Sequence, residues 1–116
     1  MKTHKDLDLW KRSVDFCIKT YNLVDSFPKN QPGNLRNHIC KSVVSIPSNI
    51  AEGAARSSQK EYLRFCYFAL GSIAELDTQL IIAEKLKFFK EDKIFSELED
   101  IKRMTIGLIR SIERKI

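Results

Sequence analysis

Hydrophobic side chains recur at intervals of three and four residues along most of the chain, a spacing that places them on one face of a helix. The spacing predicts four helices, over residues 8–26, 34–53, 58–86 and 92–116, and we find no strand pattern. Two prolines and a glycine separate the first two helices. The predicted fold class is therefore all-α, an antiparallel up-down four-helix bundle that forms a single domain over residues 1–116.

Local signals mark the ends of these helices. The first should end before Phe27–Pro28, because a residue that precedes proline is pushed out of the helical region. Asn34 is available as the N-cap of the second helix. Ser58 and Glu61 form a capping-box pattern, which fixes the start of the third helix.

Each predicted helix carries one apolar stripe that is suited to the core of the bundle. Four such stripes would build one hydrophobic core. The stripes comprise Trp10, Val14, Cys17, Tyr21 and Val24; Leu35, Ile39, Val43, Ile46 and Ile50; Tyr62, Phe65, Ala69, Ile73, Leu76, Leu80 and Ala83; and Ile94, Leu98, Ile101, Thr105, Leu108, Ile112 and Ile116.

The first three helices carry further large apolar residues outside these stripes. A bundle helix needs little more than ~100° of apolar arc, so a monomer would leave these side chains in water. We therefore predict a homo-oligomer. The alternative is that loops fold back over these residues, or that they are ordinary scattered surface residues. The predicted oligomer interface consists of Leu9, Phe16, Leu23, Phe27, Leu63, Leu70 and Ile81.

Pro47 lies inside the apolar pattern of the second helix. Proline has no N–H for the carbonyl four residues earlier, and it costs about 3 kcal/mol in a helix interior. Either the helix ends near Ser45 and a new turn begins, or a kinked helix continues with its freed carbonyl bonded by Asn49, Ser48 or water. We predict the kinked helix, with Asn49 as the tie and Gly53 near the C-terminal stop.

The chain carries a formal net charge of +5, and the basic excess is greatest between residues 34 and 60. Lysine and arginine at this density favour contacts with RNA or DNA phosphates, although a solvated helix surface is the alternative explanation. No aromatic residue is interleaved with these basic residues in a way that suggests base stacking, so binding should follow the backbone and not the base sequence. The candidate contacts are Arg36, Lys41, Arg56, Lys60 and Arg64, with Lys5, Lys11 and Arg12 as auxiliaries.

Residues suited to catalysis or metal binding are sparse. His38 and Cys40 point about 200° apart on a helix and cannot share a metal ion. The acidic pairs fall at helix starts or on polar faces, and the glycines are isolated. We expect no enzyme activity, metal or cofactor, and three reduced cysteines. The charged N-terminal segment and the lack of a long apolar run predict a cytoplasmic protein without a membrane partner.

Several segments occur in an order and at a spacing that resemble a known family. They are Asp6–Lys11, Phe27–Pro28, the nonapeptide from Ser45 to Gly53, Arg56, and the run from Gly71 to Leu80. Together they resemble the small bacterial four-helix-bundle proteins first noticed inside intervening sequences of large-subunit ribosomal RNA genes. The similarity covers almost the whole chain.

The resemblance implies a four-helix bundle that assembles as a ring, commonly a pentamer. A related set, the accessory proteins of diversity-generating retroelements, binds reverse transcriptase and nucleic acid. Cys40–Lys41 stands where the family usually carries an Arg-Arg pair, which weakens direct transfer of a basic site. The predicted function is a non-enzymatic homo-oligomer that binds RNA or DNA through a basic surface repeated around the ring. The alternative is a scaffold that docks a partner protein such as a nucleic-acid enzyme.

Overall fold

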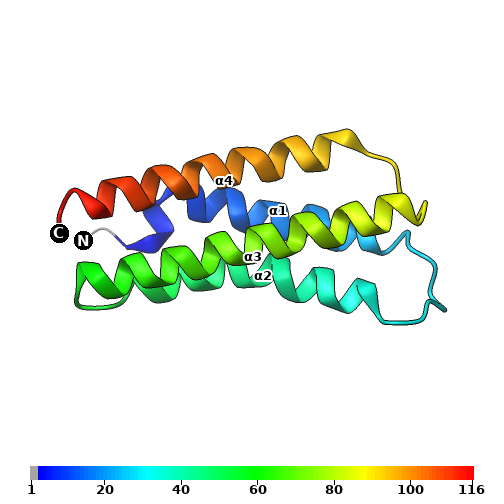
Figure 1. Ribbon diagram of the computed structural model, residues 1–116, viewed down its shortest axis with the longest axis horizontal. Helices are drawn as coiled ribbons and strands as arrows, with labels where there is room; N and C mark the ends of the chain where they lie inside the picture. Colours follow the sequence, from blue (N-terminus) through cyan, green and yellow to red (C-terminus); the bar gives the residue numbers. More distant parts are fainter. Residues whose placement is uncertain (1–2) are drawn as a thin grey trace.

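Four long helices lie side by side in the computed structural model, which describes residues 3–116 (Figure 1). Their bundle measures 47 × 22 × 22 Å. The described residues contain no strand, so the predicted all-α four-helix fold is confirmed. After a short 3-10 helix, η1 (His4–Asp6), the helices are α1 (Asp8–Val24), α2 (Leu35–Ala54), α3 (Gln59–Lys85) and α4 (Asp92–Glu113).

The helix boundaries lie within two residues of most of the expected positions. The Ser58 hydroxyl accepts a hydrogen bond from the Glu61 backbone N–H at 3.1 Å and caps α3. Asn34 is the N-cap residue of α2, but it has a left-handed backbone with φ of 54°, and its side chain makes no capping bond. Gly33 precedes it with φ of 82°, a conformation that glycine adopts without strain.

The α2–α3 turn lies at the same end of the bundle as both described chain ends, as the green, blue and red segments of Figure 1 show. The loops that join α1 to α2 and α3 to α4 lie at the opposite end. We call the end of the bundle that holds the α2–α3 turn and the chain ends the turn end, and we define it as residues 3–12, 49–67 and 104–116. Contacts between α2 and α3 run in opposite directions along the two helices, since Ser42 contacts Glu75 and Ser45 contacts Ser72.

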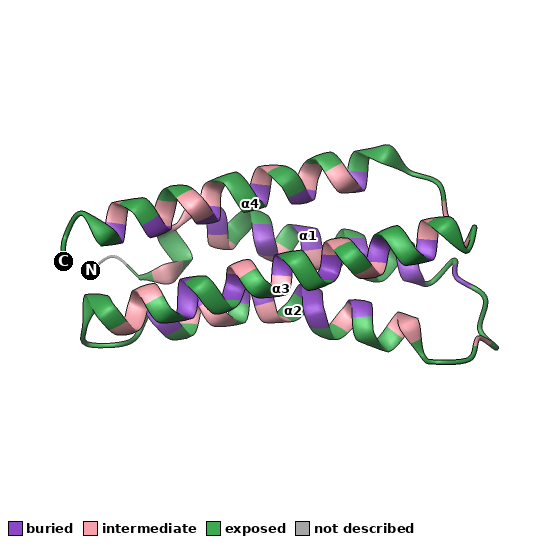
Figure 2. Ribbon diagram, viewed as in Figure 1, coloured by how far each residue is buried: buried purple, intermediate pink, exposed green. Residues whose placement is uncertain are grey.

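The predicted core stripes of α2, α3 and α4 face the interior (Figure 2). Leu35, Tyr62 and Leu108 are half-buried members of these stripes, and Ile116 is exposed beyond the end of α4. α3 is long and apolar enough, by length and composition, to cross a membrane, a test that a core helix of a bundle also passes. Some of the apolar side chains of α3 face the core, and the others lie on its outward face.

The predicted core face of α1 is only partly right: Val24 is buried and Trp10 and Cys17 pack against the core, whereas Tyr21 is exposed. Leu9, Phe16 and Phe27, which were expected to face another copy, are buried in the core of the same protomer, and Phe16 is only 2% exposed. The stripe that faces the core also includes Ser13 and Thr20, both of which are buried. The Ser13 hydroxyl donates to the Leu9 carbonyl at 2.7 Å. Ser13 interrupts the apolar pattern without interrupting the core, because the backbone of its own helix satisfies the hydroxyl.

The remaining predicted interface residues do not form a single exposed surface. Leu23 is half-buried and packs against the main core. Leu63 and Leu70 are half-buried and pack against a smaller cluster that includes residues of α4. These three half-buried side chains therefore give little support to an interface with another copy. Ile81 is exposed, and its place in an interface stays a prediction.

α2 continues as one helix through Pro47, which excludes the alternative that it ends near Ser45. The carbonyl that Pro47 leaves without a backbone donor belongs to Val43. The thiol of Cys17 on α1 donates to this carbonyl, with an S–O distance of 3.3 Å. Asn49 was predicted to bond the freed carbonyl, and this is wrong: its amide donates to the Ser45 carbonyl at 2.8 Å. Thus a neighbouring helix satisfies the backbone at the proline.

We expect Cys17→Ala to lower the free energy of unfolding by about 1–3 kcal/mol, because the carbonyl of fully buried Val43 loses its donor. Burial raises the pKa of the Cys17 thiol to about 11, so the thiol keeps the proton that it donates. Cys17→Ser should restore part of the stability. Cys40→Ala is the control, since that half-buried thiol makes no hydrogen bond within the described residues. Urea denaturation measures all three, and an unchanged midpoint for Cys17→Ala would contradict the role.

Gly53 lies one residue before Ala54, the last residue of α2, so it is near the C-terminal end of the helix as predicted. A Cβ at this position would lie 2.7 Å from the Phe65 Cβ and 3.2 Å from the Tyr62 carbonyl oxygen. Real Cβ contacts are not this short, so only glycine allows α2 and α3 to approach this closely. The role of Gly53 is helix packing and not helix termination.

Candidate nucleic-acid interface

The positive charge of the chain gathers at the turn end. This end carries nine Lys or Arg residues against five Asp or Glu. Residues 13–48 and 68–103, which form the remainder of the described bundle, carry ten of each. Two helix N-termini and two C-termini meet at the turn end, so their dipoles largely cancel and the side-chain charge remains. The turn end is therefore the basic part of the molecule.

The five basic residues singled out from the sequence are divided between two places. Arg56, Lys60 and Arg64 lie at the turn end, whereas Arg36 and Lys41 lie in the other half of α2. Residues 36 and 56 are twenty positions apart, nearly all of them in α2, which corresponds to roughly 30 Å. The five residues therefore do not form one surface.

Arg36 and Lys41 have surroundings that do not favour phosphate binding. The Arg36 guanidinium pairs with the Asp25 carboxylate at 2.6 Å. Lys41 lines a groove of about 300 Å³ between α2 and α3, together with Glu75 and several polar side chains. Glu75 accepts a hydrogen bond from the Ser42 hydroxyl at 2.7 Å. A carboxylate therefore lies close to each of these two cations.

At the turn end, the guanidinium of Arg56 lies over the ring of Phe65, with 4.8 Å between the guanidinium carbon and the ring centre. The same guanidinium donates to the Glu52 carboxylate at 2.9 Å. Phe65 is buried, so its ring is a fixed surface against which the arginine rests. The close approach of α2 and α3 at Gly53 brings Arg56 and Phe65 together across the turn.

A second arginine and a second phenylalanine extend this arrangement along α3. The Arg64 guanidinium carbon lies 5.2 Å from the centre of the Phe68 ring, and Arg64 also pairs with Glu61 at 3.5 Å. The two phenylalanine rings meet edge to face, with 5.4 Å between their centres. We call Arg56, Arg64, Phe65 and Phe68 the Arg–Phe cluster.

The Arg–Phe cluster contradicts the expectation that no aromatic residue is interleaved with the basic residues. One signal for it was present in the sequence, since Arg64 and Phe68 are four residues apart on a helix and therefore neighbours on its surface. The pairing of Arg56 with Phe65 crosses the turn and depends on helix packing. Sequence reasoning also missed three basic residues of the turn end, namely Arg110, Arg114 and Lys115 at the end of α4.

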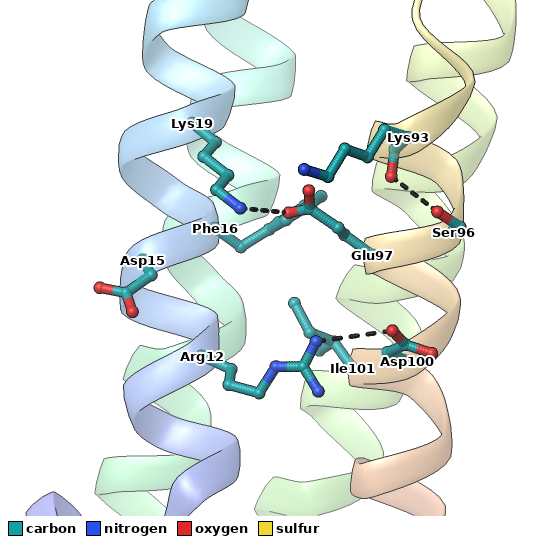
Figure 3. Close-up of a pocket in the computed structure, with 9 residues that line it drawn as sticks. All are labelled: Arg12, Asp15, Phe16, Lys19, Lys93, Ser96, Glu97, Asp100 and Ile101. Carbon is teal, nitrogen blue, oxygen red and sulfur yellow. Dashed lines mark hydrogen bonds and ion pairs between the residues drawn. The ribbon is translucent and has the colours of Figure 1, made fainter.

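A cleft between α1 and α4 is the other conspicuous feature of the surface (Figure 3). Its volume is about 390 Å³, and Phe16 and Ile101 are among its lining residues. Ion pairs cross it from Arg12 to Asp100 at 3.5 Å and from Lys19 to the Glu97 carboxylate at 2.9 Å. Three basic and three acidic side chains line the cleft, so it has no preference for an anion. It joins two helices that no loop connects directly.

The described residues contain no group of three His, Cys, Asp or Glu side chains placed to hold a metal ion. The three cysteines are free thiols. Burial raises the pKa of Cys66 to about 11 and also raises the pKa of Cys40. The reactive thiolate form of both is therefore scarce near neutral pH.

Comparison with known proteins places the chain in a family. The family described as 23S rRNA-intervening sequence protein matches residues 5–108. The chain belongs to this family. A member of the S23 ribosomal protein family from Bacteroides thetaiotaomicron, a crystal structure of unknown function, has a similar fold with a TM-score of 0.79. The two proteins are 19% identical, over 87% of this chain and 97% of the other, so the likeness concerns the fold. No curated protein matches the chain.

The family match covers α1, α2 and α3 and reaches into α4, which accounts for the agreement between the sequence resemblance and the observed fold. The 23S rRNA-intervening sequence protein family is thus established for this chain by its sequence, and the four-helix fold by its structure.

Proposed function

We propose that this 23S rRNA-intervening sequence family member is a non-enzymatic homo-oligomer that binds the RNA or DNA backbone through its turn end. The observation that carries the proposal is the concentration of the net positive charge at that end, while the rest of the described bundle is neutral. Lysine and arginine that neutralise phosphates release counterions, which gives sequence-independent, salt-sensitive affinity.

One protomer offers only a few contacts to such a ligand. Three of the nine basic residues at the turn end, Arg12, Arg56 and Arg64, already pair with carboxylates. Exposed pairs of this kind are weak and a phosphate can compete with them, but they reduce the net attraction. Several turn ends held together in a ring would add their contacts, because each later contact becomes intramolecular. Oligomerisation therefore forms part of the proposal.

Exposed apolar residues outside the turn end supply a different interface from the one predicted from sequence. Ile18 and Tyr21 on α1 and Val44 on α2 are exposed, and so are Ile81 and Ile82 on α3. In the described residues no Cα atom of α1 lies within 8 Å of one of α3, so the two helices lie diagonally across the bundle and their outward faces lie on different sides. Contact between two unlike patches is head-to-tail and closes into a ring when the rotation permits. The family resemblance implies a pentamer.

We expect light scattering at micromolar concentration to give a mass that is a multiple of 13.5 kDa. Ile81→Lys with Ile82→Lys should shift the protein toward the monomer, because two charges would replace apolar contacts in the proposed interface. Ser96→Lys on α4 is the control and should leave the mass unchanged. A wild-type mass near 13.5 kDa would contradict the oligomer.

Charge reversal at the turn end tests nucleic-acid binding. Lys60, Arg110 and Arg114 form no ion pair within the described residues and lie outside the Arg–Phe cluster. Changing all three to Glu should raise the Kd for labelled RNA or DNA at least about tenfold and flatten its salt dependence between about 50 and 200 mM. Fluorescence anisotropy measures both quantities.

The matched control reverses three lysines outside the turn end, Lys29, Lys41 and Lys90, which changes the net charge by the same amount. It should raise the Kd by less than about threefold, because only the remote field changes. Equal losses in the two triple variants would assign binding to net charge and not to the turn end. Absence of binding at low salt would contradict the proposal.

A protein-docking scaffold is the second candidate, and the exposed apolar residues of α3 favour it. A bundle that uses Ile81 and Ile82 for a partner protein would remain a monomer alone and would bind no nucleic acid at low salt. The same two measurements therefore separate the two candidates.

A further inference from the structure

The Arg–Phe cluster extends from the turn end along α3 to Phe68, and it differs from the other basic residues of the turn end because its cations rest on aromatic rings. Phe65 is the buried base of the cluster, and Phe68 contacts it edge to face. Phe68 is 44% exposed, and the Arg64 guanidinium lies over it. The Arg64 side chain is itself 62% exposed, so the side of the guanidinium away from the ring is open to solvent.

This arrangement presents a flat cation held at the surface. A guanidinium is planar, and its faces stack on aromatic groups while its N–H edges donate hydrogen bonds to phosphate. The ring of Phe68 restricts where the Arg64 guanidinium can lie, so less freedom is lost when a ligand binds. The ion pair with Glu61 joins two exposed side chains at 3.5 Å and competes only weakly with a phosphate.

A nucleobase has the face that fits such a surface. Unpaired bases stack on aromatic side chains and on guanidinium planes, and this stacking tolerates any base sequence. In a duplex the base faces are covered by their neighbours, and a protein reaches only phosphates and base edges. The cluster therefore offers a contact that a single strand can use and a duplex cannot.

We propose that the Arg–Phe cluster binds unpaired nucleotides, with a base stacked on Arg64 and Phe68 and the adjoining phosphate held by the two arginines. This inference rests on the proposed function and narrows its ligand to single-stranded RNA or DNA. The phosphate contacts come from charge alone, whereas the preference for a single strand comes from the planar groups.

The test compares a labelled strand of about 20 nucleotides, as RNA and as DNA, with the duplex of the same sequence in the same buffer. The wild-type protein should bind the single strand at least about fivefold more tightly than the duplex. Arg64→Lys keeps the charge but removes the planar group, and Phe68→Leu keeps an apolar side chain but removes the ring. Each should lower the ratio of the duplex Kd to the single-strand Kd to about one, because only the single strand uses the planar groups.

Arg110→Lys is the matched control, a charge-preserving change at the same end of the bundle but outside the cluster, and it should keep the preference. If Phe68→Leu alters the melting temperature, the strand preference of Arg64→Lys decides the test, because Arg64 is exposed and its replacement should not disturb the fold. Equal, salt-dependent binding of single strand and duplex by the wild type would overturn this inference and leave the proposed function standing. Absence of binding to either at low salt would overturn both. Tighter binding of RNA than of DNA would support the inference with RNA as the source of the strand.

Discussion

Phe16→Ala is expected to lower the free energy of unfolding by about 3–5 kcal/mol, a large share of the stability of a domain of this size. The Phe16 side chain is 2% exposed and belongs to the main core, so its removal leaves a cavity inside the protomer. The loss should not depend on protein concentration, because the contacts that are lost lie within one chain.

Urea denaturation at two protein concentrations measures this effect. Asn22→Ala is the control, since Asn22 lies on the same helix, is exposed and belongs to neither apolar patch. It should change stability by no more than about 0.5 kcal/mol. A small loss of unfolding free energy for Phe16→Ala, accompanied by dissociation of an oligomer, would instead indicate that Phe16 lies in the interface predicted from sequence.

Gly53→Val is expected to lower the free energy of unfolding by about 2 kcal/mol or more. The new Cβ would meet the Phe65 Cβ, which is fixed to the backbone of α3 and cannot rotate away. α2 and α3 must therefore separate near the turn, which would also move Arg56 away from the ring that it covers.

Gly71→Ala is the matched control for this substitution. A Cβ at Gly71 meets no atom within 4 Å, and the residue lies in the interior of α3. Alanine should raise stability there by about 0.5–1 kcal/mol, because glycine loses more backbone freedom when a helix forms. Opposite signs for the two variants in thermal melts would confirm the role of the close approach, and a stabilising Gly53→Val would contradict it.

The helices and three of the four core faces could be predicted from sequence, because their apolar residues follow helical spacing almost without interruption. The face of α1 could be predicted only in part. Ser13 and Thr20 look polar in the sequence, yet both are buried. The Ser13 hydroxyl bonds to the carbonyl one turn earlier, while the Thr20 hydroxyl is buried and has no partner among residues 3–116. Polarity read from sequence does not reveal whether a helix can satisfy a hydroxyl locally.

The candidate site was only partly accessible from sequence, since it depends on which segments meet in space. Arg56, Lys60 and Arg64 are close in the chain and were found. Arg110 and Arg114 are distant in the chain and become neighbours of this region only when four helices fold side by side. The bond from Cys17 to the carbonyl of Val43 depends on the register of α1 against α2, which helical periodicity does not fix.

The position of the chain ends has a practical consequence for every assay of this surface. A purification tag or fluorescent protein fused at either terminus would stand beside the basic region and could shield it from a ligand (Figure 1). A dye is better placed on the opposite loop, for instance through Asn30→Cys, where the side chain is exposed. The new thiol would react ahead of Cys17 and Cys66, whose pKa values of about 11 leave them mostly protonated at neutral pH.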